Sequence, residues 1–495
     1  MKKFLLGLLI TLAVILALAG TVILLANSYA SNNGSDKIPE RVEIEKNELG
    51  TIVAVGRGLY DENGDLFEIK GINFGNLFIA EGWMTVNSVG AAYEKDGSFV
   101  RVNEDGIVEE YEEIYQEEMD AIFAERFTDE EIEALNDAFI SAYCTEEDFR
   151  LISDSGLNTV RLPVYYRTFL NTHDRYRLSD EALCAMDFDD IELDFEKVDM
   201  FIEYAKKYDL KVILDMHGVM GGQSGYEHCG TKDMDFWETE ENIVFMCNLW
   251  RAIAEHYATD RADLASTILA YDLVNEPTKR TEIGTGPLQW QVMDRLYDAI
   301  REVDDCHVIS IEGVWYPISL PSPEKYGWEN VLYQYHFYNW NHDKGISNEM
   351  FYSLMYVLYS ISDYDVPKFV GEFNFFNNDG AWAKYLAKYD DLGWGWTIWS
   401  YKIVSVGWWD SSWGLAVNKL NIQNDVENTP IEDYELKLDL RTATYDEIMA
   451  VWSGEHTQYG GQEGSYKIYH DGALYGVLKD YFGEDFKVDP KAIVE

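Results

Sequence analysis

The chain has 495 residues, 47% of them hydrophobic, so it can bury a large core and still carry appendages beside one main domain. Its 39 Lys and Arg against 89 Asp and Glu give a formal net charge of -50, which argues against nucleic acid as a partner because phosphates would be repelled. The 5 cysteines include no CxxC pair, so neither a disulfide framework nor a cysteine metal site is predicted, and buried free thiols are expected.

The N-terminal segment has the features of a targeting signal. Lys2 and Lys3 precede an uncharged apolar stretch from Phe4 to Ala26, and a polar segment follows up to Asp36. The stretch is long enough to span a bilayer, yet Ser-Tyr-Ala at residues 28–30 resembles a cleavage site. The segment is therefore either a cleaved signal peptide or a membrane anchor, and its length favours the anchor. In both cases we expect an extracellular protein, secreted or anchored to the outer face of the cell membrane.

Short apolar runs alternate with helix-like segments along most of the chain, which is the pattern of a parallel α/β architecture. Eight such runs would close a barrel, so the sequence predicts an α/β fold of the (β/α)8 TIM-barrel type. The predicted strands are residues 71–76, 158–164, 211–218, 268–277, 307–313, 331–338, 368–374 and 394–402. Just before them, GLYDENGDLFEIKG predicts a hairpin that turns at Asn63-Gly64 and plugs the bottom of the barrel.

The segments between the strands have the caps and the periodicity of helices. Thr145-Glu146-Glu147-Asp148 is a capping-box pattern, and the helix after it is expected to stop at Gly156. Two further helices are predicted at residues 195–205 and 289–303, where apolar residues recur on one helical face.

Two segments depart from the barrel pattern. An acidic insertion from Met84 to Tyr143 follows the first strand, and its charge run is expected to lie on solvated helix faces. The C-terminal extension has helix-like stretches at residues 445–452 and 473–481, which we expect to pack on the barrel. The predicted division is residues 1–36 for the targeting segment, 37–417 for the barrel and 418–495 for the extension.

Polar or aromatic side chains lie at the carboxyl ends of most predicted strands. In a (β/α)8 barrel these ends meet around one site, because the variable loops converge there. Each residue alone has a structural explanation, such as a loop salt bridge or a satisfied core histidine, but their convergence indicates a site. The residues are Arg161, His217, Asn275, Glu276, His336, Tyr338, Glu372 and Trp399.

Glu276 and Glu372 end the fourth and seventh predicted strands, so their carboxyl groups are expected to face each other across the barrel mouth. Glycoside hydrolysis needs such a pair, one carboxyl protonated to assist the leaving group and one ionised to attack or stabilise the anomeric carbon. An ionised neighbour raises the pKa of the protonated partner, which keeps an acid available near neutral pH. The pair therefore predicts a glycosidase.

The motifs around the two glutamates resemble those of a known enzyme family. YDLVNEP on the fourth predicted strand and VGEF on the seventh are similar to the two catalytic motifs of glycoside hydrolase family 5. The resemblance continues through NTVRLPV, DMHG, YHFY and WTIWSYK, from about Gly71 to Trp413. GNLFIAEGWM and HGVMGGQSGYEHCG resemble the exo-β-1,3-glucanase branch more than the compact endo-cellulases.

The resemblance implies a retaining double displacement, with Glu276 as general acid and then base and Glu372 as nucleophile. It also implies that Asn275 donates a hydrogen bond to the sugar 2-hydroxyl. From charge and hydrogen bonding we expect that Arg161 keeps Glu372 ionised and that Tyr338 orients Glu372. His217 and His336 are expected to hydrogen-bond sugar hydroxyls or the carboxylates. Aromatic stacking makes Trp399 the expected platform beneath the sugar in the cleaved subsite.

Further candidates come from two loops and one strand end. Gln223 and Ser224 lie in a glycine-rich loop near the substrate and are candidate polar contacts. The loop after strand eight holds Trp409 and Trp413, which would extend an aromatic floor, although packing of the loop explains at least one of them equally well. Glu312, at the end of strand five, is expected to form a salt bridge at the rim.

Several functional alternatives stay open. An exo-β-1,3-glucanase or related β-glucosidase is favoured, since the insertion before strand two would wall off one end of the groove. An endo-β-1,4-glucanase or another β-glycanase such as a mannanase is the alternative, and an inactive carbohydrate-binding protein is a remote one. A metal-dependent barrel hydrolase would need paired ligands that the 9 histidines do not supply, so neither metal nor cofactor is expected. We expect a monomer that binds a β-glucan polysaccharide or oligosaccharide.

Overall fold

The structure is a computed structural model of the chain. It describes a few residues between 17 and 28 and then residues 34–85, 87–90, 92–95, 98–102, 108–110, 114–278, 287–313, 320–339, 350–355, 357, 363–376, 378–403, 413–417, 435–436, 438–455, 467–468 and 473–488. The predicted boundary at residue 418 lies outside this part of the chain.

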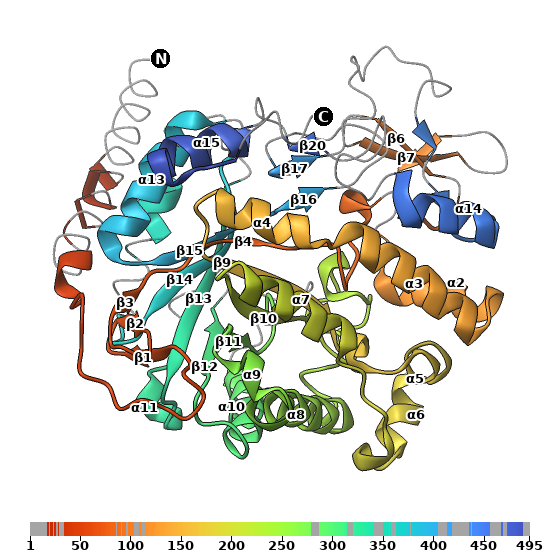
Figure 1. The fold of residues 1–495 in the computed structure, drawn as a ribbon, viewed down its shortest axis with the longest axis horizontal. Coiled ribbons are helices and arrows are strands. Elements are labelled where there is room, and N and C mark those ends of the chain that lie inside the picture. Colours follow the sequence, from red (N-terminus) through yellow and green to blue (C-terminus); the bar gives the residue numbers. More distant parts are fainter. Residues whose placement is uncertain are drawn as a thin grey trace, which may run out of the picture.

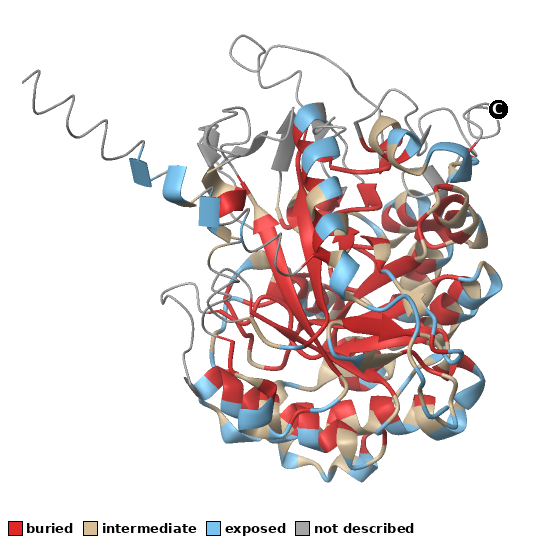
Figure 2. Ribbon diagram, turned by 90° about the vertical axis from the view of Figure 1, so that its left-hand side faces the viewer, coloured by how far each residue is buried: buried red, intermediate tan, exposed pale blue. Residues whose placement is uncertain are grey.

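Parallel strands close into a barrel at the centre of the molecule, and all eight predicted strands take part in it (Figure 1). Almost every residue of these strands is buried, because side chains fill the inside and helices cover the outside (Figure 2). In order around the barrel the strands are β10 (Lys211–Gly218), β11 (Ile268–Asp272), β12 (Val308–Glu312), β13 (Val331–Tyr338), β14 (Lys368–Asn374), β15 (Gly395–Ile398), β4 (Lys70–Asn73) and β9 (Thr159–Tyr165).

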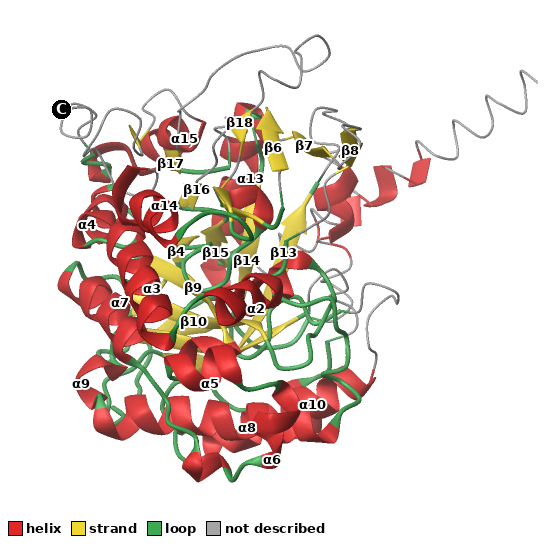
Figure 3. Ribbon diagram, turned by 90° about the vertical axis from the view of Figure 1, so that its right-hand side faces the viewer, coloured by secondary structure: helices red, strands yellow, loops and turns green. Residues whose placement is uncertain are grey.

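Helices surround the yellow strands in Figure 3 and shield them from solvent. The capping pattern before α4 is confirmed, since the Asp148 carboxylate accepts the Thr145 N–H at 2.7 Å. The barrel helices are α4 (Glu146–Asp154), α5 (Thr172–Arg177), α6 (Asp180–Ala185), α7 (Glu196–Lys207), α8 (Glu240–Glu255), α9 (Ala262–Ala265), α10 (Pro287–Arg301), α11 (Pro323–Tyr326) and α13 (Asp379–Leu392). Two of them, α7 and α10, lie within two residues of the predicted bounds.

A small antiparallel sheet closes the amino-terminal end of the barrel, as predicted. It contains β1 (Val53–Val55), β2 (Gly58–Tyr60) and β3 (Leu66–Phe67). The predicted turn holds Gly64 at a φ of 79°, a conformation that favours glycine. Leu59 and Phe67 pack with Ile213 and Phe369 of the barrel in one apolar cluster. The hairpin therefore caps the inside of the barrel opposite the predicted site.

The insertion and part of the C-terminal extension form one subassembly. Its helices are α2 (Gln116–Arg126), α3 (Asp129–Tyr143) and α14 (Tyr445–Ala450), and Figure 1 shows α14 near α3 and beside β6 and β7. Phe123 and Trp452 lie in its apolar cluster, with ring centroids 5.2 Å apart. Its strands are β5 (Asn87–Ser88), β6 (Ala92–Lys95), β7 (Ser98–Val102), β8 (Val108–Glu110), β18 (Glu435–Leu436) and β19 (Leu438–Asp439).

Backbone pairing joins the two halves of this subassembly, because β18 pairs with β6 and β19 pairs with β5. The last helix, α15 (Ala473–Phe482), packs instead on the barrel beside α13, where Tyr481 meets Trp396 with ring centroids 5.5 Å apart. A further small sheet contains β16 (Lys402–Ile403), β17 (Ala416–Val417) and β20 (Lys467–Ile468).

The cysteines are all free, as expected. Cys144 and Cys229 are buried, whereas Cys184, Cys247 and Cys306 are only half-buried, so the expectation of burial is right for two of the five. Among the described residues no helix combines the length and apolar character needed to cross a bilayer. Most of the apolar stretch from Phe4 to Ala26 lies outside the described part of the chain.

A buried ion pair joins β16 to α4. The ammonium group of Lys402 lies 2.8 Å from Asp148 Oδ1, and neither side chain is exposed to solvent. Lys402 also donates to the Tyr143 carbonyl at 2.6 Å, while Asp148 accepts from the Tyr401 hydroxyl at 2.9 Å. Burial lowers the pKa of Lys402, and the neighbouring Asp148 carboxylate opposes that shift.

Replacing Lys402 by Met is expected to lower the free energy of unfolding by about 3–5 kcal/mol, because it leaves the Asp148 charge buried without its partner. Urea denaturation of the variant measures the loss. In the double variant Lys402→Met/Asp148→Asn much of the stability should return, since the unpaired charge is gone. A loss below about 1 kcal/mol in the single variant would show that water or other groups already compensate the carboxylate.

Candidate active site

The predicted polar residues come together at the carboxyl ends of the barrel strands. Hydrogen bonds and ion pairs connect them across the barrel, and all of them are buried except Tyr338, which is half-buried. They are Arg161 on β9, His217 on β10, Asn275 and Glu276 after β11, His336 and Tyr338 on β13, and Glu372 on β14. The barrel therefore places side chains from five strands around one point.

Arg161 is the cation at the centre of this network. Its Nη1 donates to Glu372 Oε1 at 2.8 Å, and its Nη2 donates to Asn275 Oδ1 at 2.9 Å. The carboxylates of Asp215 and Asp272 lie 3.0 and 2.9 Å from the same guanidinium. Burial alone would lower the pKa of Arg161, but the surrounding carboxylates hold it above its ordinary value. Arg161 is therefore a permanent positive charge.

Glu372 is the carboxyl group beside that charge. Besides Arg161 it accepts a hydrogen bond from the Tyr338 hydroxyl at 3.0 Å. Burial raises the pKa of Glu372, and the Arg161 guanidinium opposes the rise. Two donors aimed at its two oxygens favour the ionised form, so Glu372 is the anionic member of the pair.

Glu276 has different neighbours. Its Oε1 lies 2.9 Å from His336 Nδ1, and its Oε2 lies 3.4 Å from His228 Nε2. Both imidazoles are neutral, because burial holds the pKa of His336 well below its usual range and lowers the pKa of His228 to about 3. Burial and then the charge of Glu372 raise the pKa of Glu276 well above its ordinary value. Glu276 is therefore the member that carries a proton.

The two carboxyl groups stand close together. One oxygen of Glu276 and one of Glu372 lie within 4.8 Å of each other. A retaining glycosidase needs a separation of about 5–5.5 Å, whereas an inverting one leaves roughly 6.5–9.5 Å for a water molecule. The spacing suits direct attack by one carboxylate on the sugar.

Glu276, His336 and Glu372 also form a set, within the described ranges, whose spacing a metal ion would accept. The Arg161 guanidinium is already bound to Glu372 at 2.8 Å and opposes a second cation there. His336 and Glu276 are directly hydrogen-bonded to each other. The arrangement suits proton transfer better than metal binding.

His217 and Asn275 form another side of the site. His217 Nδ1 lies 2.6 Å from Asp215 Oδ2, and burial lowers the pKa of His217 to about 3. A neutral ring that donates from Nδ1 has Nε2 free to accept, and this atom lies 3.4 Å from Asn275 Nδ2. Because Arg161 holds the Asn275 oxygen, the amide presents its donor end on the His217 side.

Comparison with known proteins gives the family. The model described as "Cellulase (glycosyl hydrolase family 5)" matches residues 124–405, more than half of the chain. The chain belongs to glycosyl hydrolase family 5. The matched range contains all seven polar residues of the site.

Relatives of this family 5 protein carry several names. A glucan 1,3-beta-glucosidase of Blumeria graminis is 29% identical over 211 residues, which cover 42% of this chain and 41% of that protein. A beta-xylosidase of Phanerodontia chrysosporium is 29% identical over 224 residues, covering 44% and 42%. The match thus spans less than half the length of these curated relatives. The solved structure of rutinosidase from Aspergillus niger is 14% identical, with a TM-score of 0.44, covering 70% of this chain and 95% of that one.

Trp399 follows β15 and lies next to this family 5 site. Its ring is nearly parallel to that of His217, with centroids 5.5 Å apart and planes 13° apart, and it is 3% exposed. A Cβ at Gly75 would come within 3.1 Å of the Trp399 ring, so glycine leaves room for it. Trp399 also belongs to an apolar cluster with Phe376 and Trp413. The structure brings Trp399 to the site, while its contact with a sugar stays a prediction.

Replacing Trp399 by Ala is expected to reduce kcat/KM by more than about tenfold, because a stacking surface worth on the order of 1 kcal/mol is lost and water enters the site. Kinetics on the folded fraction and thermal unfolding are measured together. Trp396→Ala is the matched control, since Trp396 is equally buried on β15 but faces Tyr481. It should lower Tm and leave kcat/KM unchanged. The same outcome for Trp399→Ala would make Trp399 a core residue.

The structure differs from two sequence predictions, for Gln223 and Glu312, and a third concerns a residue outside the described ranges. Gln223 is not available to substrate, because its amide donates to the carbonyls of His217 and Asn275 at 2.7 and 2.9 Å and is fully buried. It fastens the loop after β10 to the loop after β11. Glu312 is not at the rim either, since it is fully buried and accepts the Glu276 N–H at 2.7 Å. Trp409 lies outside the described residues.

Ser224 is fully buried, like its neighbour Gln223. Its hydroxyl lies 3.1 Å from His228 Nε2, the nitrogen that faces Glu276. Ser224 thus contacts the site through His228.

Several charged groups around the site are not predictable from the strand ends. Asp215 and Asp272 belong to the motifs DMHG and YDLVNEP, but they precede the residues at the predicted strand ends. Glu81 and Glu227 come from the loops after β4 and β10, where the Gly82 N–H donates to Glu227. Burial and then Glu227 raise the pKa of Glu81 well above its ordinary value.

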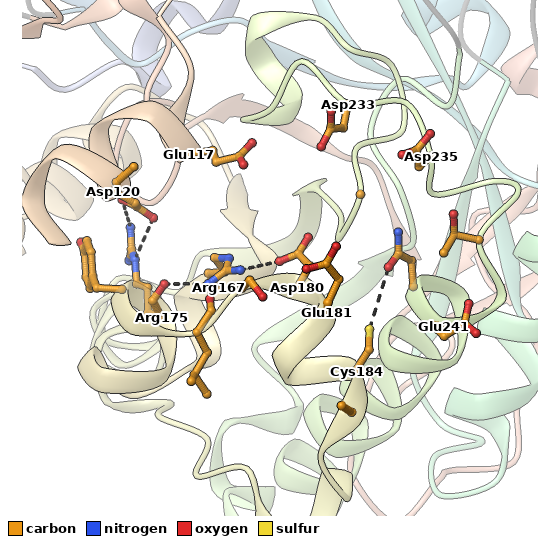
Figure 4. Close-up of a pocket in the computed structure, with 18 residues that line it drawn as sticks. Glu117, Asp120, Arg167, Arg175, Asp180, Glu181, Cys184, Asp233, Asp235 and Glu241 are labelled. Atoms are coloured by element: carbon orange, nitrogen blue, oxygen red, sulfur yellow. Dashed lines mark hydrogen bonds and ion pairs between the residues drawn. The ribbon is translucent and has the colours of Figure 1, made fainter. Parts of the chain in front are cut away.

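A separate cavity of about 660 Å³ lies between α2, α6 and the loop after β10. Figure 4 shows carboxylates on its walls and two arginine side chains among them, with Arg175 3.3 Å from Asp120 and Arg167 paired with Asp180. No residue of the Arg161 network lines it. This cavity is therefore distinct from the site around Arg161, although it is large.

Proposed function

We propose that this family 5 protein is a retaining β-glycosidase that hydrolyses a β-glucan chain. The observation that carries the proposal is the carboxyl pair, with oxygens of Glu276 and Glu372 within 4.8 Å of each other and only Glu372 bound to Arg161. This asymmetry gives one acid and one nucleophile from two identical side chains.

In the first step the ionised Glu372 attacks the anomeric carbon as the bond to the leaving oxygen breaks. Glu276 gives its proton to that oxygen, so the leaving group departs as a neutral alcohol. Arg161 and Tyr338 keep Glu372 oriented through their hydrogen bonds of 2.8 and 3.0 Å. The product of the step is a glycosyl ester on Glu372.

In the second step water attacks the same carbon and the ester bond to Glu372 breaks. Glu276, now ionised, takes the proton from the water, which restores both carboxyl groups to their starting state. Two inversions give net retention of the anomeric configuration. Neutral His336 stays hydrogen-bonded to Glu276 at 2.9 Å in both roles, because it donates from Nδ1 to the carboxyl oxygen.

We favour exo-action on β-1,3-linked glucose, by an exo-β-1,3-glucanase or a related β-glucosidase. Several relatives are named glucan 1,3-beta-glucosidase, at 29% identity in the example above. The loops after β4 and β10 are joined by the hydrogen bond from Gly82 to Glu227, which supports a site closed at one end. Endo-cleavage of a β-1,4-glucan is the second candidate, since the matching family model is described as a cellulase.

The purified protein should be incubated with laminarin, lichenan, carboxymethylcellulose, xylan and mannan, and the products separated over time. Release of glucose alone from laminarin at early times is the expected result, whereas a ladder of oligosaccharides from carboxymethylcellulose would favour the endo-cellulase. Proton NMR of the first product should show the β-anomer. An α-anomer would contradict the retaining mechanism.

We also propose that residues 1–36 direct export and that the protein acts outside the cell as a monomer. The support is the Lys2-Lys3 pair followed by the apolar stretch up to Ala26. When cells that express the protein with a C-terminal tag are fractionated, the tagged protein should be found in the medium or on the outer face of the cell membrane. Tagged protein found only inside the cell would contradict export. The molar mass from light scattering tests the monomeric state.

A further inference from the structure

Glu312 lies beside the acid/base and has no part in the reaction steps above. It ends β12, its side chain is fully buried, and its Oε2 accepts the backbone N–H of Glu276 at 2.7 Å. Its Oε1 lies 3.4 Å from His336 Nδ1, the atom that is also 2.9 Å from Glu276 Oε1. Glu312 therefore contacts both the backbone of Glu276 and the ring that orients its carboxyl group.

The backbone contact matters because Glu276 has an unfavourable conformation. Its φ is 40°, in the left-handed region that residues with a Cβ seldom adopt. The preceding residue, Asn275, still donates its N–H to the Met216 carbonyl of β10 at 3.0 Å, but the Glu276 N–H goes to the Glu312 carboxylate. Without this acceptor the peptide can relax to a negative φ, which would turn the Glu276 side chain away from Glu372.

The contact with His336 matters for the proton. When Glu312 is ionised its carboxylate only accepts, and Oε1, 3.4 Å from His336 Nδ1, then favours the His336 tautomer with hydrogen on Nδ1. That hydrogen is the one that reaches Glu276 Oε1. The opposite tautomer would place a lone pair against both carboxyl oxygens and would leave Glu276 without a donor.

Burial, several charges and one hydrogen bond act on the Glu312 carboxyl group. Burial and then Glu276 and Asp272 raise the pKa of Glu312 well above its ordinary value. Arg161 and the hydrogen bond from the Glu276 N–H act in the opposite direction. The two carboxyl groups differ in their contacts, since Glu312 Oε2 accepts the Glu276 N–H at 2.7 Å whereas Glu276 Oε1 lies 2.9 Å from His336 Nδ1.

We propose that Glu312 is a positioning residue that holds Glu276 for proton transfer to the leaving group, through the Glu276 N–H and through His336. The proposal rests on the glycosidase function proposed above. Its main effect falls on the acid/base, because Arg161 and Tyr338 hold Glu372 at 2.8 and 3.0 Å, whereas His336 Nδ1 lies 3.5 Å from that carboxylate.

The test compares two substrates with the same sugar. Phenyl β-glucoside needs a protonated leaving oxygen, whereas 2,4-dinitrophenyl β-glucoside departs without one. For Glu312→Leu, kcat/KM on the phenyl glucoside should fall about 100-fold, and on the dinitrophenyl glucoside by less than about threefold. Glu312→Gln keeps an oxygen for the Glu276 N–H but removes the charge, so a smaller loss is expected. For Glu312→Gln, the fall of kcat/KM at high pH (the basic limb of the pH profile) on the phenyl glucoside should also move to lower pH.

The matched control is Asp304→Asn. Asp304 is another buried carboxylate that accepts backbone N–H groups, from Cys306 at 2.8 Å and His307 at 3.1 Å, just before the start of β12. This variant should have a lower Tm but an unchanged ratio of kcat/KM on the phenyl glucoside to kcat/KM on the dinitrophenyl glucoside. If Glu312→Leu slows both substrates equally, or only lowers Tm, Glu312 is merely structural and the proposal is overturned.

The outcome stays decidable if the wild-type protein cleaves neither glucoside, a result that would count against the proposed function. Crystal structures of the wild type, Glu312→Leu and Asp304→Asn then show whether the Glu276 carboxyl moves. Displacement in Glu312→Leu alone supports the positioning role. An unmoved carboxyl and an unchanged positive φ at residue 276 in Glu312→Leu would overturn it.

Discussion

Glu372→Ala is expected to lose at least about 10³-fold in kcat on every substrate, because no group remains to attack the anomeric carbon. Added azide should restore cleavage of 2,4-dinitrophenyl β-glucoside, since a small anion fits the space left by the carboxylate. Azide then enters from the face opposite the leaving group, so the product should be the α-glycosyl azide. NMR of that product is the measurement.

The fold should survive this substitution. Glu372 contributes negative charge to a site already rich in it, and its removal leaves Arg161 paired with Asp215 and Asp272 at 3.0 and 2.9 Å. Circular dichroism and Tm should therefore stay close to those of the wild type. Wild-type turnover in Glu372→Ala would remove Glu372 from the mechanism altogether.

Glu276→Ala is expected to lose about 10²- to 10⁴-fold on substrates with poor leaving groups and far less on 2,4-dinitrophenyl β-glucoside, because only the former need a proton. With the activated substrate the glycosyl ester on Glu372 should accumulate and appear as a burst. Azide should then intercept the ester from the opposite face and give the β-glycosyl azide. The two variants thus yield azides of opposite configuration from one substrate.

The pH dependence of the wild type belongs to the same prediction. Because the pKa of Glu276 is raised well above its ordinary value, the protonated form persists toward neutral pH, and kcat/KM should fall only as Glu276 loses its proton at higher pH. In Glu276→Ala this basic limb should vanish. A basic limb that survives the substitution would assign the proton to another group.

Much of the barrel and its site follows from local sequence patterns. The strand positions are predictable because each is a short apolar run bounded by turn residues, and the polar residues at their ends are predictable because parallel strands must end at one edge. Arg161 and Glu372 lie 211 positions apart in the sequence and yet touch, as the barrel prediction requires.

The failures share a physical cause. Gln223 and Glu312 are polar residues beside a site, and sequence pattern cannot tell whether such a side chain faces a ligand or a backbone N–H or carbonyl that lost its partner at a strand end. His228 was missed because one histidine in a long loop carries no periodic signal. Its approach to Glu276 depends on how the loop after β10 folds back, which tertiary contacts decide.

The shared core of the insertion and the extension bears on how the chain is made. The Trp452 indole donates to Asn87 at 2.9 Å across 365 residues, so the core that the insertion and the extension share cannot form until residue 452 has left the ribosome. The barrel strands, by contrast, can pair as they emerge. A nascent chain from which β15 has emerged would hold a complete set of barrel strands, whereas β5 and β6 of the insertion would still lack their partners β19 and β18.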